Sequence, residues 1–524
     1  MLDGADLSQT VIGARATIPV RILRILLVTA IAGFFFVGIP VLNRQGVIPD
    51  YRIQLLGKYL CFAIAAIGAD LIWGYTGMLS LCQALFFCLG GYAIGMYLSL
   101  PQGGGIYDVP QFLSFAYYGS DDPMPLFWKP FKWLPVAVIL GFLVTAVVST
   151  VFGFFIFRSR VRGVYFSIVT QAVAWGAWLM MCQNAMLMGG TNGLTNFSKS
   201  FSQERSWIVG LYLLTCGCLV FAYVVCRWIT RSRAGRVMVA IRDKEMRLYF
   251  AGYKPHAFKV FAFTVGSLVA ALGGMLYPAQ VQIITPQDMN VQASIDLVVL
   301  VAVGGRGKLW GAILGALLVT TLRSSFTSDL PSFYYLLYGL TFILVVLFLP
   351  DGIAGLWGSI ETAISTGQEL AEALSSLIIF AALAAFILAE DLDLMPPLLQ
   401  SEPIILIPLG KLWLISLVVL ALYAWLAVTT LKSDMGRRGR TILLSLGGAA
   451  ALASLILCII KLREPIAFQM KFKYPILIGA IVFAVLIRLL AKRFRQPAAV
   501  APDAGATEVP EDDNESDSPR VSVA

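Results

Sequence analysis

The stretch from Ser167 to Phe197 combines residue types that could bind a small neutral solute. An apolar segment rich in Trp, Met and Ala is followed there by paired glycines and uncharged amides. The candidate path residues are Gln171, Gln183, Asn184, Thr191 and Asn192, with Gly189, Gly190 and Gly193 allowing the backbone to approach. Uncharged groups bind by hydrogen bonds rather than ion pairs, so the set suits an amide-like solute. A hydrogen bond between helices is the alternative role for each side chain.

The composition places these residues in a membrane. Hydrophobic residues make up 58% of the 524-residue chain and charged residues 13%, whereas about 25% of a soluble protein is charged. Apolar runs near the roughly 20 residues that cross a bilayer recur along the chain, without the alternation of a membrane barrel. The sequence therefore predicts an all-α polytopic membrane protein.

The apolar runs predict about ten helices in a core and about four more beyond it. The predicted spans are 22–42, 55–73, 78–100, 134–157, 163–183, 207–229, 258–281, 293–305, 308–325 and 333–350, then 373–390, 403–431, 441–460 and 474–491. The GGRGK sequence between the eighth and ninth spans is also compatible with a re-entrant hairpin. The predicted division is a cytoplasmic N-terminus (1–20), a transmembrane core (21–357), additional C-terminal helices (358–495) and a disordered acidic tail (496–524).

The basic residues predict the orientation, because basic loops stay on the cytoplasmic side. With the N-terminus inside, alternate crossings place 158–162 and the segment from Arg227 to Lys259 inside, along with the C-terminus. Lys129, Lys132 and the basic residues of 461–473 fall outside and fit less well. The formal charge of +9 is thus spread over separate loops, which argues against nucleic-acid binding.

Few charged residues are expected at membrane depth. Asp70 and Asp296 are carboxylates at span ends, either hydrogen-bonded there or part of a solute path. Arg323 is expected to snorkel towards the interface. His256 is the single histidine and lies in a basic loop, and the eight cysteines lack metal-ligand spacing. No metal site or catalytic cluster is therefore predicted.

The sequence also lacks a phosphate-binding loop. GGRGKL (304–309) has neither the earlier glycine nor the Ser or Thr after Lys that such a loop needs. The chain is therefore predicted not to be an enzyme and to carry no cofactor, so that ATP and Mg would be used by partner subunits. The segment 231–263 predicts a short amphipathic helix ending near Gly252, which could fit a groove on a soluble partner or be a solvated basic loop.

Six collinear motifs carry a resemblance to a known family. They are GYTGMLSLCQALFFCLGGYAIGMY (74–97), FRSRVRGVYFSIVTQA (157–172), GGTNGLT (189–195), GRVMVAIRDKEMRLYFAGY (235–253), VAVGGRGKLWGAILGA (301–316) and FLPDGIAGL (348–356). Over residues 20 to 357 the chain resembles second permease subunits of urea ABC transporters, within the branched-chain amino acid permease family. Two features depart from it: Gln183 stands where a charged residue is usual, and the four terminal spans are additional.

The resemblance implies an inner-membrane permease that works with a sister permease, two cytoplasmic ATPase subunits and a periplasmic substrate-binding protein. It implies that the loop engaging the ATPase runs from Ala240 to Gly252, with Arg242, Asp243 and Glu245 as the contact residues. Urea is the implied solute, and branched-chain amino acids or short-chain amides are alternatives within the class. A passive or ion-coupled carrier, and a scaffold or sensor using residues 358–524, are the alternatives from other classes.

Overall fold

The computed structural model describes residues 33–45, 48–100, 125–159, 163–195, 197, 205–329, 339 and 352–355. The elements in the first half are η1 (Phe34–Gly38), α2 (Ile39–Arg44), α3 (Asp50–Thr76), α4 (Gln83–Ser99), η3 (Lys129–Lys132), α6 (Leu134–Arg158), α7 (Val164–Met181), η4 (Asn184–Met186), η5 (Gly190–Asn192) and β1 (Leu194–Thr195). Those that follow are α8 (Arg205–Arg231), α9 (Arg233–Phe250), α10 (Pro255–Val281), β2 (Ile283–Ile284), η7 (Pro286–Met289), α11 (Val291–Gly304) and α12 (Leu309–Asp329).

The described part of the chain is a bundle of helices, as predicted. Helices α3, α6, α7, α8 and α10 are long and apolar enough to cross a membrane, and α11 with α12 would add a sixth span. The predicted spans at 55–73, 134–157, 163–183, 207–229 and 258–281 match these five helices to within a few residues. The predicted N-terminus (1–20), the first part of the predicted span at 22–42 (to residue 32), the spans predicted after 329 and the tail at 496–524 lie outside the described residues, apart from 339 and 352–355.

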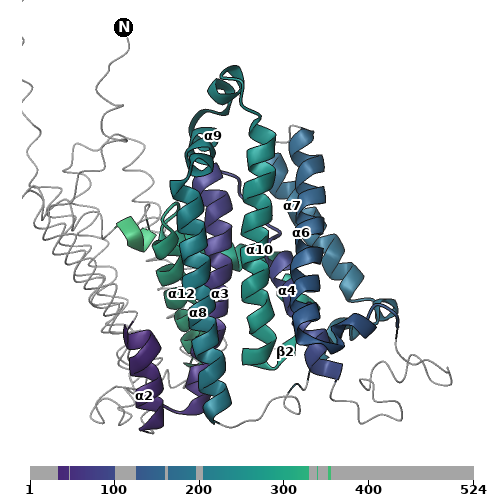
Figure 1. Cartoon of the computed structure of the whole chain (residues 1–524), viewed down its shortest axis with the longest axis vertical. Helices are drawn as coiled ribbons and strands as arrows, with labels where there is room; N and C mark the ends of the chain where they lie inside the picture. The colour runs from purple at the N-terminus through teal and green to yellow at the C-terminus, as the bar shows by residue number, and fades with distance from the viewer. Residues whose placement is uncertain are drawn as a thin grey trace, which may run out of the picture.

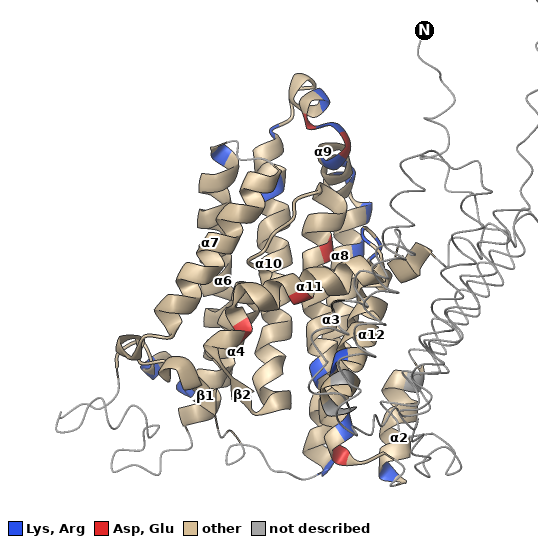
Figure 2. Ribbon diagram, turned by 180° about the vertical axis from the view of Figure 1, so that it is seen from behind, with Lys and Arg blue, Asp and Glu red and all other residues tan. Residues whose placement is uncertain are grey.

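Helices α3 and α10 form the centre of the bundle. Helix α10 packs along α3 on one side and along α4 and α6 on the other, while α8 and α12 pack against α3 (Figure 1). Most residues in the apolar stretches of α3 and α10 are buried inside the bundle, whereas fewer than a third of those in α6, α7 and α8 are buried. Figure 2 shows the charged residues of α9 gathered at one end of this bundle.

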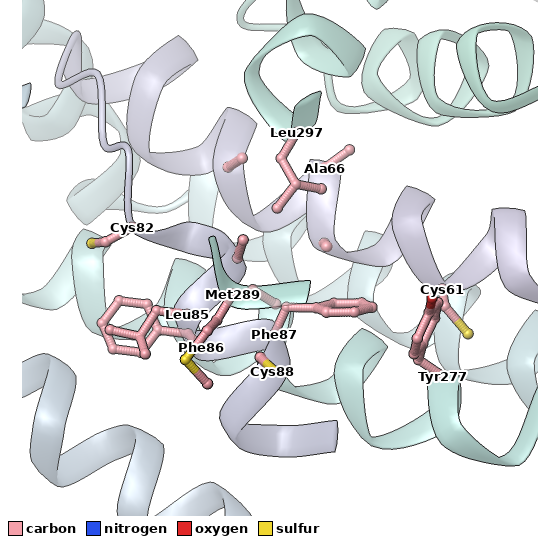
Figure 3. Packing of buried hydrophobic residues seen from close by; sticks show 14 of the residues in the cluster. Cys61, Ala66, Cys82, Leu85, Phe86, Phe87, Cys88, Tyr277, Met289 and Leu297 are labelled. Carbon is pink, nitrogen blue, oxygen red and sulfur yellow. The ribbon is translucent and has the colours of Figure 1, made fainter. Parts of the chain in front are cut away.

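The core between α4 and α10 is built from aromatic side chains (Figure 3). The ring centroids of Phe87 and Tyr277 lie 5.3 Å apart, and those of Phe86 and Phe263 lie 5.5 Å apart, both in edge-on geometry. Such pairs contribute about 0.5–1.5 kcal/mol beyond the burial of their area. Without a hydrophobic force between helices in lipid, close packing of this kind holds the bundle together.

The predicted span at 78–100 is wrong at its start. Helix α3 ends at Thr76 and is capped by Gly77, whose φ of +74° is left-handed, and α4 begins only at Gln83. The intervening backbone is irregular, and two of its polar groups bond to side chains of α7: Ser167 donates to the Leu79 carbonyl (2.8 Å) and Leu81 N–H donates to Thr170 (3.1 Å). Irregular backbone at membrane depth is tolerated only where such partners exist.

The eighth and ninth predicted spans are one bent hairpin. Helices α11 and α12 meet at an angle of 116° across 305–308, a geometry that fits either one broken span or the re-entrant hairpin. The backbones approach closely there, because a side chain at Gly304 or Gly311 would meet the other residue's carbonyl oxygen. Figure 2 shows α11 lying across the bundle instead of along it.

Candidate functional site

The amide-rich stretch folds into a compact turn after α7. Two short 3-10 helices, η4 and η5, follow one another, and Gly189, Gly190 and Gly193 all have positive φ. Asn184 lies against Gly190, so closely that a side chain on the glycine would overlap the amide oxygen. This geometry explains the paired glycines of the sequence and defines what we call the amide turn, residues 183–193.

A two-stranded sheet fixes the amide turn to the end of α10. Strands β1 and β2 pair antiparallel, with Leu194 opposite Ile284 and Thr195 opposite Ile283. Next to β2, Thr285 and Asp288 form a capping box on η7. Burial raises the pKa of the Asp288 carboxyl, and its hydrogen bonds from Thr285 act in the opposite direction. The turn is therefore held at the end of the bundle away from α9.

Gly193 is the position where this arrangement depends on glycine. Its φ of +67° and ψ of −154° define a backbone conformation that residues other than glycine rarely adopt, and a side chain there would overlap the Ile284 carbonyl. We expect Gly193→Ala to destabilise the purified protein by about 1–3 kcal/mol, the usual range for such backbone strain. Thermal melting in detergent measures this, with Gly210→Ala, which has open surroundings in α8, as the matched control. Equal melting temperatures for the two variants would contradict the expectation.

The structure brings together only part of the predicted path. Gln183, Asn184, Thr191 and Asn192 are all exposed on the amide turn. Gln171 is exposed on α7 itself, twelve residues before Gln183, which corresponds to roughly 18 Å along a helix. The described residues thus present Gln171 and the turn as separate polar points on the outside of the subunit.

Buried polar side chains that the sequence analysis missed line the break between α3 and α4. Gln83, at 2% exposure, donates to Ser80 (3.3 Å), and Ser294 of α11 accepts from the Ala84 N–H (3.3 Å). The amide oxygen of Gln83 has no partner among the described residues. The four uncharged residues SLCQ (80–83) could have drawn attention to this place only if the helix break had been foreseen, since Ser294, which bonds to the start of α4, is distant in sequence.

Among the charged residues at membrane depth, Asp70 and Asp296 are hydrogen-bonded carboxylates, one of the two roles expected for them, whereas Arg323 differs from expectation. Arg323 does not simply snorkel, because its guanidinium contacts the Asp296 carboxylate at 2.6 Å, joining α12 to α11. Gln292 also donates to Asp296, at 3.3 Å. Asp70 is fully buried and accepts a hydrogen bond from the Gly307 N–H at 2.7 Å. Both carboxylates therefore hold the α11–α12 hairpin in place.

The amphipathic helix of the basic segment is confirmed and is longer than expected. Helix α9 runs from Arg233 and is kinked at Lys244. Its end has the two hydrogen bonds of a Schellman motif: Gly252 N–H to Tyr249 (3.1 Å) and Tyr253 N–H to Leu248 (3.2 Å). Gly252, with a φ of +82°, takes the left-handed position of that motif.

The three predicted ATPase contacts, Arg242, Asp243 and Glu245, all have partners within the chain. Arg242 donates to the Gly74 carbonyl of α3 (2.9 Å) and pairs with Asp243 (3.1 Å). Glu245 pairs with Lys259 of α10 at 2.7 Å, with both side chains largely buried. Ala240 and Asp243 are both exposed. An intermolecular role for these residues stays a prediction.

The comparisons with known proteins place the bundle in a family. Residues 51–346, more than half of the chain, match the family model described as branched-chain amino acid transport system / permease component. This range covers α3 to α12, and therefore the amide turn, α9 and the hairpin. No solved structure matches the chain significantly.

Relatives of known function are transport permeases. The high-affinity branched-chain amino acid transport system permease protein LivM of Escherichia coli K12 is 24% identical over 319 residues, covering 56% of this chain and 68% of the relative. BraD of Pseudomonas aeruginosa, a permease of the same description, is also 24% identical, covering 56% and 91%. The ribose import permease RbsC of Haemophilus influenzae is 21% identical, covering 43% and 69%. The chain is therefore an ABC-type permease and belongs to the family of permease components of branched-chain amino acid transport systems.

Proposed function

We propose that this permease imports a small neutral amide, with urea as the first candidate. One observation carries the proposal: the described residues from Val164 to Thr195, which include α7 and the amide turn, contain no charged side chain. A solute passing them meets amide, hydroxyl and backbone groups only. These groups match the carbonyl and amino groups of urea, whereas a zwitterion would gain no ion pair there.

Many weak hydrogen bonds suit transport of such a solute. A polar group that enters an apolar region without a partner loses several kcal/mol. The exposed amides of the turn offset this loss, and because each neutral hydrogen bond contributes only about 1 kcal/mol net, the solute can also leave. Gln171 would act as a further polar point along α7, facing the path between this subunit and its sister permease.

The placement of α9 supports an energy source outside the chain. Under the positive-inside rule the basic segment from Arg227 to Lys259 is cytoplasmic, so the amide turn at the other end faces the periplasm. A periplasmic binding protein would deliver the solute to the turn, and two ATPase subunits would act on the cytoplasmic end of the two permeases. Met246, Tyr249 and Phe250 are exposed on α9 and supply an apolar surface for an ATPase groove.

A branched-chain amino acid is the second candidate, and a specific observation favours it. The Asp296–Arg323 pair lies in the α11–α12 hairpin, with the Arg323 side chain 46% exposed. A carboxylate and a guanidinium together could bind the ammonium and carboxylate groups of an amino acid. The names of relatives such as LivM and BraD agree with this solute.

Uptake by proteoliposomes that contain both permeases, the ATPases and the binding protein separates the two solutes. We expect ATP-dependent accumulation of labelled urea that excess leucine does not inhibit. Asn184→Asp should reduce urea uptake about tenfold, because a carboxylate binds amino groups more strongly than an amide does and slows release. The matched variant Asp296→Asn should leave urea uptake within a factor of two, because its side-chain oxygen can still accept the hydrogen bond from Arg323 that joins α12 to α11.

Other results would redirect the assignment. Leucine uptake without urea uptake, lost in Asp296→Asn and kept in Asn184→Asp, would replace urea by the amino acid. Uptake that persists when the ATPases are omitted would show a carrier and contradict the proposal.

A further inference from the structure

Three elements meet at one turn near the end of α3. Asp70 accepts from the Gly307 N–H (2.7 Å) of the α11–α12 hairpin, and the Gly74 carbonyl accepts from Arg242 (2.9 Å) of α9. Lys308 extends the contact by donating to the Ala354 carbonyl (2.9 Å). We call Asp70, Gly74, Arg242 and Gly307 the α3 junction. Its members come from parts of the chain that are 168 and 237 residues apart in sequence.

The packing of the α3 junction leaves no free space. A side chain at Gly74 would overlap both the Asp70 carboxylate and the Gly307 backbone. Gly307 has a φ of +80°, which the hairpin turn requires. Because protein interiors are closely packed and not freely deformable, α9 cannot shift along α3 without moving either the Gly74 carbonyl or the residues that surround it.

Charge strengthens the same contact. Asp70 is fully buried, and the guanidinium groups of Arg242 and Arg306 both act electrostatically on its carboxyl. Arg306 also stacks over the Trp73 ring, 5.4 Å from its centroid. A buried carboxylate is costly without such partners. Separating the hairpin from α3 would therefore leave the buried Asp70 carboxyl without the hydrogen bond from Gly307, so the hairpin is held in one position until something displaces Arg242 or Gly74.

We propose that Asp70 is a positioning residue that transmits movement of α9 to the α11–α12 hairpin. A push on α9 reaches Gly74 through Arg242, and the Asp70–Gly307 hydrogen bond carries it to the turn at 305–308. The hairpin, whose helices are packed glycine against glycine, then moves as one body beside the path. The inference rests on the proposed contact between α9 and an ATPase, and it is independent of which solute is carried.

The test compares solute transported per ATP hydrolysed in the full reconstituted complex, using whichever of urea or leucine the wild type accumulates. We expect Asp70→Leu and Gly74→Ala to keep basal ATPase activity and to lower this ratio about tenfold, a coupling change of 1.4 kcal/mol. Asp70→Asn should stay within about threefold of wild type, because its side-chain oxygen still accepts from Gly307. Gly176→Ala, a glycine with open surroundings in α7, is the control and should match wild type.

A wild-type ratio in Asp70→Leu or Gly74→Ala would overturn the proposal. If both fail to assemble, Arg242→Ala decides, because its side chain is 39% exposed and its loss leaves the core intact. A lowered ratio with unchanged ATPase binding supports transmission through the α3 junction, whereas a normal ratio or lost ATPase binding contradicts it. If the wild-type complex accumulated solute without hydrolysing ATP, the proposed function itself would be contradicted. That result differs from a normal transport ratio in the variants, so the two failures are distinguishable.

Discussion

A valine at Gly274 is expected to prevent the bundle from packing. Gly274 lies on α10 where it crosses α4, and a side chain there would overlap the Phe87 carbonyl oxygen. The obstacle is backbone, so no rotamer change relieves it, and the two helices must separate. Overpacking usually costs about 1–3 kcal/mol and occasionally more. At this crossing we expect at least about 3 kcal/mol, because the aromatic contacts of Phe87 and Tyr277 would be lost together.

The measurement is the fraction of monodisperse protein after detergent extraction, together with its melting temperature. Gly176→Val is the matched control, since the surroundings of Gly176 on α7 are open and valine has a better helix propensity than glycine. We expect the Gly176 variant to behave as wild type and the Gly274 variant to aggregate or melt far below it. A Gly274 variant with wild-type stability would show that α4 and α10 do not cross as closely as described.

The long helices could be predicted because crossing a bilayer needs one continuous apolar run. Helices α6 and α8 begin and end within about two residues of the spans drawn at 134–157 and 207–229. The prediction failed where an apolar run is not one helix. The residues from Gly77 to Cys82 belong to an apolar run, yet they are not helical. Ser167 and Thr170 supply hydrogen bonds there that a helix would otherwise provide internally.

The candidate site could be predicted where its residues are close together in the sequence. Paired glycines between amides indicate a turn, and the amide turn is present at 183–193. Composition could not show that Asp70 would meet Gly307 or that Arg242 would meet Gly74, since these contacts depend on how distant helices pack. The sequence likewise did not indicate that Arg323 would pair with Asp296, which lies opposite it in the folded hairpin.

Reversing the charge of Glu245 is expected to uncouple ATP hydrolysis from transport. Glu245 contacts Lys259 at 2.7 Å, and the side chains are 23% and 10% exposed. Breaking a buried pair costs about 3–5 kcal/mol, and solvent at this partly exposed site reduces that to roughly 1–3 kcal/mol. Glu245→Lys places two ammonium groups together and should force α9 away from α10. We expect solute transported per ATP to fall about tenfold or more.

The swapped pair decides where Glu245 acts. If the contact within the chain matters, the double variant Glu245→Lys, Lys259→Glu should recover most of the transport, because the ion pair reforms with its charges exchanged. If Glu245 instead contacts the ATPase directly, the swap restores nothing, since the ATPase still meets the wrong charge. Double-mutant coupling of about 1 kcal/mol or more would show that the two residues act as one unit. Recovery would assign Glu245 to the α9–α10 contact and leave the exposed residues Asp243, Met246 and Tyr249 as the surface that meets the ATPase.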